Sequence, residues 1–310
     1  MARPDVEPDR HLSRDALLGR CEFPTGAITC AVSGGADSLA LLVLACATGA
    51  DVTAIHVDHG LRSGSEHEAA LVASVAERFG AAFRSERIEV APGPNLEARA
   101  RAARYAILPR EVCTGHTADD QAETVLLNLL RGAGVPGLAA MRRGPRHPIL
   151  RLRRAETRSL CDQLALTPID DPMNSDPRFQ RVQVRQQVLP LLDSVAQRDL
   201  VPLLCRQSEL ASDVVEVLDL LAADLDPTDA KQVSAAPAAV ARWALREWIR
   251  RSTGSDHPVD ADAIERALAV ARGEIRATEL DGWRLSRTAR RLRLAPVVAD
   301  RDGAEPASDR

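Results

Sequence analysis

The sequence predicts an α/β protein in which a doubly wound, mainly parallel sheet of five strands is followed by a mostly helical C-terminal domain. Two observations support this prediction. In the first half of the chain, short β-branched and apolar runs alternate with segments of helical spacing, which is typical of a parallel sheet covered by helices on both faces. In the second half, leucine and valine recur at helical spacing over long segments.

The elements can be placed from these patterns in chain order. Strands are expected at residues 28–32, 51–57, 83–90, 112–114 and 149–150, and helices between them at 38–47, 66–79, 96–108 and 119–130. Further helices are expected at 178–223, 237–251 and 259–271, before strands at 278–280, 283–287 and 291–294. The dipeptide Asp281-Gly282 is a strong hairpin-turn signal between the first two of these last strands.

A chain of 310 residues, 45% of them hydrophobic, exceeds what one core usually serves, so we expect more than one domain. The expected parts are a disordered N-terminal segment (1–20), a catalytic domain (21–195), a helical domain with a terminal hairpin (196–298) and a disordered tail (299–310).

Composition restricts the class of protein further. The six cysteines form no CxxC pair, which argues against a zinc finger, a redox dithiol or a disulfide framework, and favours the cytoplasm. The N-terminus has no apolar signal-peptide core, and no run is long enough to cross a membrane. Lys231 is the only lysine, so the chain lacks the lysine that a Walker P-loop and a protein kinase require.

The glycine-rich stretch at residues 33–38 predicts a phosphate-binding loop between the first strand and its helix. Adjacent glycines let backbone N–H groups approach an anion, and the N-terminus of the helix favours negative charge at the same place. A carboxylate beside bound phosphates needs a cation between them, so Asp37 is a candidate Mg²⁺ ligand. The alternative is a solvated turn with helix-capping side chains. The candidate ATP-binding residues of this loop are Ser33, Gly34, Gly35, Ala36, Asp37 and Ser38.

Polar clusters also follow the second and fourth strands, where ligands of doubly wound sheets bind. His56 and Asp58 form one cluster, and the other contains Gly115, His116, Asp119, Asp120 and Glu123. Asp120 and Glu123 are three residues apart on a predicted helix and therefore share a face. The acids could instead simply complement the helix dipole, and the histidines could be buried core residues. If His56, Asp58, His59, His116 and Asp120 bound metals, the protein would be a phosphoesterase, although Gly60 stands where that motif needs a second histidine.

Residues 33–38 resemble the PP-loop of the ATP pyrophosphatases, which cleave ATP between the α- and β-phosphates. Taken with the other clusters, the chain resembles the tRNA(Ile)-lysidine synthases over about residues 27–185. The resemblance extends through residues 100–105, 130–138, Met141, 147–150 and 170–174.

This resemblance implies a ligase that forms a C–N bond. The 2-keto oxygen of the wobble cytidine of tRNA(Ile) with anticodon CAU attacks the α-phosphate of ATP, and free L-lysine then displaces AMP. It implies ATP and Mg²⁺ as cofactors, and a homodimer is a further expectation. We assign catalysis to Asp37, Asp120 and Glu123, and metal binding to Asp37, Asp119 and Asp120. His56, Asp58, Gly115 and His116 join the phosphate loop as candidate ATP contacts.

Arginine is locally in excess beside the predicted site. Between Arg131 and Arg158 the chain has eight arginines and one acid, Glu156, as an RNA backbone would require, although a solvated basic face would look the same. The candidate tRNA-binding residues are Arg101, Arg104, Arg131, Arg142, Arg143, Arg181 and Arg185, and the helical C-terminal domain is expected to hold the tRNA body.

Other functions remain open from the sequence. A PP-loop enzyme that inserts sulfur into tRNA would share the adenylation step but would need reactive cysteines. The residues are also compatible with a metal-dependent phosphoesterase and with a non-catalytic nucleotide-binding module.

Overall fold

The structure is a computed structural model that describes residues 13–58, 65–88, 99, 103, 106–169, 176–254 and 259–297. By its contacts the chain divides into two compact units, Met1–Ser212 and Asp213–Arg310. The sequence placed a boundary near residue 195, whereas helix α10 (Val201–Ala223) runs unbroken through the point of division.

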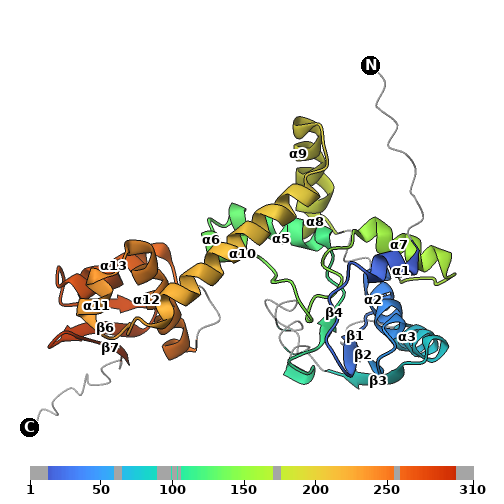
Figure 1. Cartoon of the computed structure of the whole chain (residues 1–310), viewed down its shortest axis with the longest axis horizontal. Helices are drawn as coiled ribbons and strands as arrows, with labels where there is room; N and C mark the ends of the chain where they lie inside the picture. The colour runs from blue at the N-terminus through green and yellow to red at the C-terminus, as the bar shows by residue number, and fades with distance from the viewer. Residues whose placement is uncertain are drawn as a thin grey trace, which may run out of the picture. The chain divides into compact units, whose positions relative to one another are not determined.

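The first unit is built on a parallel sheet of four strands in the order β3-β2-β1-β4 (Figure 1). The strands are β1 (Ile28–Ala31), β2 (Val52–Asp58), β3 (Ala82–Arg87) and β4 (Cys113–Thr114). Strand β1 lies in the middle, with Ile28 opposite Val52 of β2 and Cys30 opposite Cys113 of β4. The strand order therefore reverses beside β1, which is where ligands of such sheets bind.

The prediction of a fifth strand at 149–150 was wrong. Ile149 and Leu150 are buried, but they lie in a series of turns in which the Leu150 N–H bonds the His147 carbonyl at 3.1 Å. A two-residue apolar run cannot be told from a buried turn by periodicity. The segment still passes along β4, because the Thr114 N–H donates to the Arg146 carbonyl at 2.9 Å.

Both faces of the sheet are covered, as the alternation of its side chains requires. On one face Ile28, Cys30 and Ala54 pack in the main core with α2 (Ala36–Ala47) and α3 (Ser65–Phe79), which lie together in Figure 1. On the other face a smaller core contains Ile55, Val57, Ile88, Leu108 and Val112. The helix expected at 96–108 lies mostly outside the described residues.

The first unit also contains helices other than α2 and α3. They are α1 (Arg14–Leu18), α5 (Ala118–Leu130), α6 (Val135–Leu138), α7 (Arg154–Gln163), α8 (Gln180–Gln183), a π-helical stretch (Val184–Val188), α9 (Leu189–Ala196) and the first part of α10. The prediction that residues 1–20 are disordered was wrong for α1: Ser13 caps this helix, and Leu17 is buried in the main core.

The second unit has its own core between helices and a small antiparallel sheet. Its helices after α10 are α11 (Ala230–Ala235), α12 (Ala238–Thr253) and α13 (Ala261–Arg272), and its strands are β5 (Ala277–Leu280), β6 (Trp283–Thr288) and β7 (Arg291–Pro296). Leu245, Ile264, Leu268 and Leu285 are fully buried at its centre. The tail expected at 299–310 lies outside the described residues. None of the described helices combines the length and the apolar character that crossing a membrane requires.

Candidate active site

The phosphate loop, residues 33–38, leads from β1 into α2 as the sequence predicted. Gly34 has φ +84°, a backbone conformation that favours glycine, and α2 begins directly after Gly35. The Ser38 hydroxyl closes the loop by accepting the Ser33 N–H at 3.1 Å and donating to the Gly35 carbonyl at 2.9 Å. Gly35 offers no side-chain cap, so the first N–H groups of α2 are left for a ligand. The loop can therefore bind an anion through its backbone.

Gly115 holds the segment after β4 against the start of α2. A Cβ at this position would lie 3.0 Å from the backbone C and O of Asp37 and from the N of Ser38. Such contacts are shorter than about nine in ten real Cβ contacts, and backbone atoms cannot swing away as a side chain can. The structure thus gives Gly115 a packing role beside the phosphate loop, and its contact with ATP stays a prediction.

His56 and Asp58 lie at the end of β2, on the other side of β1. His56 is 1% exposed, and its Nδ1 lies 3.0 Å from the Val32 carbonyl oxygen, so this nitrogen carries the proton. Its Nε2 is buried and has no hydrogen-bond partner among the described residues. Asp58 is half-buried, and His59 lies outside the described residues. His56 therefore stabilises the strand that precedes the phosphate loop.

His116 belongs to a small group that the sequence did not predict. The Thr114 hydroxyl lies 2.8 Å from Nδ1 of both His116 and His147, and 3.1 Å from the Arg146 carbonyl. The two imidazole rings meet edge to face with centroids 5.1 Å apart. Because the hydroxyl has one proton to donate, at least one of the two imidazoles donates from Nδ1. His147 follows Arg146 in the turns beside β4, and no local pattern would have linked it to His116.

Asp37, in the first turn of α2, is held by two residues of α7. Its carboxylate accepts a hydrogen bond from the Thr157 hydroxyl and lies 3.7 Å from Nε of Arg154. Burial raises the pKa of Asp37 to about 6, the nearby charge of Asp120 adds to this rise, and the Thr157 hydrogen bond opposes it. A buried carboxylate with a raised pKa beside a phosphate-binding loop is an incompletely compensated charge that a cation would stabilise.

Asp119, a predicted metal ligand, has both carboxylate oxygens engaged by other residues. It accepts the Arg154 backbone N–H at 2.8 Å and thereby caps the start of α7. It also accepts both Nε and Nη2 of Arg153 at 3.1 and 3.2 Å. The structure thus uses Asp119 to join α7 to α5, and its metal role stays a prediction.

Asp120 and Glu123 share one face of α5, as their spacing predicted, and three arginines surround them. Glu123 is fully buried and accepts Arg154 at 3.2 Å, Arg181 at 2.8 Å and Arg185 at 2.7 Å. Asp120 accepts Arg154 at 3.0 Å and Arg181 at 3.1 Å. We call Asp37, Asp120, Glu123, Arg154, Arg181 and Arg185 the carboxylate–arginine cluster.

The arginines of this cluster control the charge of its acids. Burial by itself would raise the pKa of Asp120, but Arg154, Arg181 and the Thr117 N–H, which donates at 2.9 Å, more than offset it and hold the pKa below its ordinary value. The same contacts raise the pKa of Arg154. Asp120 is therefore an ionised carboxylate at neutral pH, and the cluster is a set of closely paired charges in a mostly buried place.

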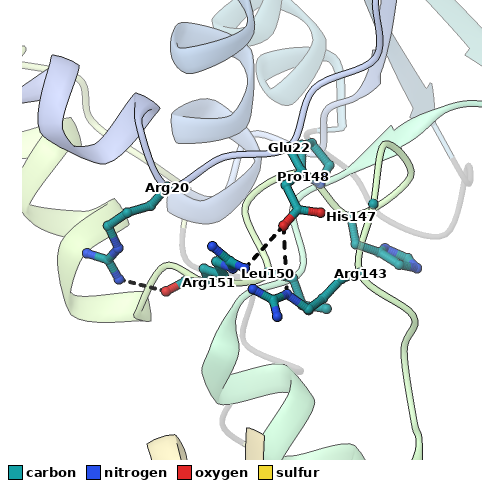
Figure 2. A pocket seen from close by; sticks show the side chains of 8 residues that line it. Arg20, Glu22, Arg143, His147, Pro148, Leu150 and Arg151 are labelled. Atoms are coloured by element: carbon teal, nitrogen blue, oxygen red, sulfur yellow. Dashed lines mark hydrogen bonds and ion pairs between the residues drawn. The ribbon is translucent and has the colours of Figure 1, made fainter. Parts of the chain in front are cut away.

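The structure divides the predicted tRNA-binding arginines into two groups. Arg181 in α8 and Arg185 in the π-helical stretch point at Glu123, where the sequence suggested an RNA-facing helix. Arg143 lies 2.9 Å from Glu209 and lines a pocket with Arg20, Glu22, His147 and Arg151, which Figure 2 shows. By contrast, Arg131 and Arg142 are exposed, and Arg131 contacts only a neutral group, Gln180, at 3.4 Å among the contacts described. Arg101 and Arg104 lie outside the described residues.

The donor set near Asp37 fits Mg²⁺ of the kind that binds largely through substrate phosphates. Mg²⁺ prefers oxygen ligands and is commonly held by one or two carboxylates together with phosphates and water. Asp37 supplies one such carboxylate at the phosphate loop, and Asp120 is close enough to influence its pKa. Within the described ranges, no three His, Cys, Asp or Glu side chains converge as a preformed metal site. The metal-ligand interpretation of His56, Asp58, His116 and Asp120 is therefore not supported there.

Comparison with known proteins identifies the family to which the chain belongs. The model of a PP-loop domain family matches residues 10–192. A tRNA(Ile)-lysidine synthase from Nocardia farcinica is 41% identical over 283 residues, which cover 86% of this chain and 89% of the relative. Relatives with the same name from Rhodococcus jostii and Corynebacterium glutamicum are each 40% identical and cover 79% and 78% of this chain, and 80% and 81% of their own lengths. The chain therefore belongs to the tRNA(Ile)-lysidine synthase family, with its PP-loop domain in the first unit.

Proposed function

We propose that this chain ligates L-lysine to the 2-position of the wobble cytidine of tRNA(Ile) with anticodon CAU, with conversion of ATP to AMP and pyrophosphate. The observation that carries this proposal is the meeting of a phosphate loop with two acids of α5 at neighbouring strand ends, in a chain of this family. The loop suits the nucleotide, and the acids suit a cationic nucleophile that must lose a proton.

In the first step, the cytidine 2-oxygen forms a bond to the α-phosphorus while the bond to the β-phosphate breaks and pyrophosphate leaves. Backbone N–H groups of Gly34 and Gly35 and the first turn of α2 would hold the departing phosphates, with the Ser33 and Ser38 hydroxyls beside them. His56 would support this loop from β2 through its bond to the Val32 carbonyl. Asp58, Gly115 and His116 border the same strand ends and complete the proposed nucleotide site.

Mg²⁺ fits the same proposal, with Asp37 as its first protein ligand and Asp120 as a second. When bound, it would neutralise charge on the pyrophosphate leaving group. The raised pKa of Asp37 supports this assignment, since the nearby guanidinium of Arg154, with Nε at 3.7 Å, does not offset the burial of the carboxylate.

In the second step, the lysine ε-amine attacks C2 of the cytidine, the C2–O bond breaks, and AMP leaves. Lysine arrives as an ammonium ion, so it needs both an anionic site and a proton acceptor. Asp120 and Glu123 offer both, because they share one face of α5 and Glu123 is shielded from water. The released proton passes to one of these carboxylates.

The tRNA backbone would use exposed arginines. Arg131, directly after α5, and Arg142, after α6, are the most exposed of the predicted set within the described ranges, whereas Arg143, Arg181 and Arg185 are half-buried and contact acids. The second unit would add further contacts to the tRNA body. A homodimer and a cytoplasmic location stay predictions of the sequence.

A sulfur-inserting enzyme is the alternative that shares the adenylation step, and the cysteines argue against it. Burial raises the pKa of Cys21 and Cys161 to about 12 and that of Cys205 to about 11, so these thiols are poor nucleophiles. Cys30 and Cys113 are fully buried in neighbouring strands.

The test is incorporation of labelled lysine into unmodified tRNA(Ile) bearing CAU, with ATP and Mg²⁺ present and a methionine tRNA with the same anticodon as the control. Selective, ATP-dependent incorporation is expected. Release of pyrophosphate with another tRNA, without lysine incorporation, would keep the adenylation chemistry but reject the proposed acceptor and nucleophile. Absence of pyrophosphate release with any acceptor would favour a non-catalytic nucleotide-binding module.

A further inference from the structure

Arg154 contacts all three carboxylates to which the proposed function assigns a cation. Its Nη2 lies 3.0 Å from Asp120, its Nη1 3.2 Å from Glu123, and its Nε 3.7 Å from Asp37. Arg181 and Arg185 reach Glu123, but among the described contacts neither reaches Asp37. Arg154 is therefore the residue of the cluster that connects the acids of α5 with the phosphate loop.

The acids of α5 leave no net attraction for a further cation. Asp120 and Glu123 carry two negative charges and face the guanidinium groups of Arg154, Arg181 and Arg185, and Glu123 has no exposed surface. A lysine ammonium added to this arrangement would create an excess positive charge in a largely buried place, which is strongly unfavourable. One resident cation must therefore leave these carboxylates before lysine can bind to them.

Arg154 is the resident cation that ATP can draw away. Its backbone is fixed, because its N–H is bonded to Asp119 at 2.8 Å, but 30% of its side chain is exposed. Its Nε already lies beside Asp37, in the first turn of α2 where the phosphates are expected. Phosphate oxygens accept paired hydrogen bonds from a guanidinium and carry more negative charge than a single carboxylate.

We propose that Arg154 is a displaceable cation that makes lysine binding conditional on ATP. Without nucleotide, its guanidinium occupies the place between Asp120 and Glu123 where the lysine ammonium must bind. When ATP binds, the guanidinium moves onto the phosphates, and the two carboxylates of α5 become available. This inference rests on the proposed function, and it predicts an order of binding in which ATP precedes lysine.

The experiment is calorimetric titration of L-lysine into the full chain, with and without Mg²⁺ and α,β-methylene-ATP, which cannot be cleaved at the reacting bond. In the wild type we expect lysine to bind at least about tenfold more tightly with the nucleotide than without it. In Arg154→Gln we expect lysine to bind more tightly without nucleotide than it does in the wild type. The lysine affinities with and without nucleotide should then differ by no more than about twofold. We also expect this variant to bind the nucleotide about tenfold more weakly, because a phosphate contact is lost.

The matched control is Arg242→Gln in the second unit, which removes an arginine whose Nε lies 2.6 Å from Glu265 and should leave both affinities as in the wild type. Arg154→Lys keeps the charge but cannot span three carboxylates. The difference between its lysine affinities with and without nucleotide should therefore lie between those of the wild type and Arg154→Gln. The unfolding midpoint of each variant is measured alongside, so that misfolding is recognised.

A folded Arg154→Gln variant that keeps the wild-type ratio and nucleotide affinity overturns the inference. So does a variant that binds lysine in neither state, because Arg154 would then help to build the lysine site instead of blocking it. If the wild type itself binds no lysine and forms no lysidine, the proposed function fails and the coupling to lysine fails with it. The nucleotide affinity of the variant then still decides whether Arg154 contacts the phosphates.

Discussion

The phosphate loop and the carboxylate–arginine cluster share Asp37 but are built in opposite ways. The loop is six consecutive residues that present backbone N–H groups, and it includes Gly34, whose φ is +84°. The cluster consists of ion pairs between side chains from α2, α5, α7 and the segment from α8 into the π-helical stretch. The loop offers unfilled donors to an anion, whereas the acids of the cluster already have cationic partners.

The phosphate loop and the cluster therefore have different requirements when no substrate is bound. Backbone donors at a helix start remain solvated without a ligand, so the loop needs no substitute for phosphate. A buried carboxylate such as Glu123 cannot be left without a cation, so the fold must supply one. The arginines thus stabilise the empty enzyme, and the substrate cation has to compete with them.

The largest expected effect of a substitution in the cluster is on stability. Glu123→Gln removes the charge that three guanidinium groups share, and breaking a buried pair in this way costs about 3–5 kcal/mol. The measurement is the free energy of unfolding in urea. The control is Glu209→Gln, whose partner Arg143 lies at 2.9 Å in a more exposed pair and which should cost less than about 1 kcal/mol. Equal losses in the two variants would show that the cluster is no more than a set of surface ion pairs.

The next effect concerns Asp37, the residue common to both regions. Asp37→Asn keeps the shape of the side chain and its acceptor for the Thr157 hydroxyl but removes its charge. We expect pyrophosphate release at saturating Mg²⁺ to fall by about 100-fold, which is about 2.7 kcal/mol of barrier. Release at the wild-type rate would contradict the metal role of Asp37.

The two regions also differ in how far the sequence reveals them. The loop was predictable because its signal is local: an apolar run, two adjacent glycines and a helix. The face shared by Asp120 and Glu123 followed from a spacing of three. Their partners did not follow, because Arg154 and Arg181 lie 31 and 58 residues from Glu123 in sequence. An excess of arginine there was interpreted as an RNA surface, and only the fold shows which arginines face acids.

The dependence on local signals also explains the errors in the predicted fold. Strands were expected at the places of β1, β2, β3 and β4, but their order in the sheet comes from the structure alone. The segment 149–150 is too short for its apolar residues to distinguish a strand from a buried turn. Helix α7 was not predicted, because its sequence from Arg154 to Gln163 is strongly polar, and one of the two acids that cap it, Asp119, lies on another helix. Leu17 in α1 was missed because a single buried leucine has no periodicity.

The pH dependence of stability distinguishes Asp37 from the paired acids. Its pKa is raised from 3.8 to about 6, so the folded state binds this proton more tightly than the unfolded state does. Stability from this group is therefore fully present below pH 3.8 and is lost as pH rises through about 6. Without Mg²⁺ and ATP, Asp37→Asn should be more stable than the wild type at pH 8, by about 1–2 kcal/mol after allowance for partial exposure. The advantage should shrink toward pH 4. The measurement is the free energy of unfolding of both proteins between pH 4 and pH 8. A difference between them that does not change with pH would contradict the burial of an ionised Asp37.

A smaller effect tests the packing of the loop itself. Gly115→Ala places a Cβ 3.0 Å from the backbone of Asp37 and Ser38, so α2 must shift slightly at its start. We expect the Michaelis constant for ATP to rise several-fold and the free energy of unfolding to fall by about 1 kcal/mol. The control is Gly19→Ala, which has an ordinary φ of −60° and a Cβ 3.6 Å from its nearest neighbour, the Asp15 carbonyl oxygen. Similar behaviour of the two variants would show that the close approach of Gly115 does not position the loop.

The smallest expected effect separates arginines that can serve RNA from those that serve the fold. Arg131 is exposed with a neutral contact, whereas Arg143 lies between Glu22 and Glu209 at 3.8 and 2.9 Å. If each arginine that binds a phosphate releases about one counterion, Arg131→Gln should lower the slope of log affinity for tRNA against log salt by about 1. Arg143→Gln should leave that slope near its wild-type value and lower the free energy of unfolding instead. The reverse result would mean that the acids release Arg143 when tRNA arrives. In that case acids would occupy RNA-binding arginines in the substrate-free protein, as Arg154 is proposed to occupy the lysine site. The contrast between exposed and acid-paired arginines would then hold only for the protein without its substrates.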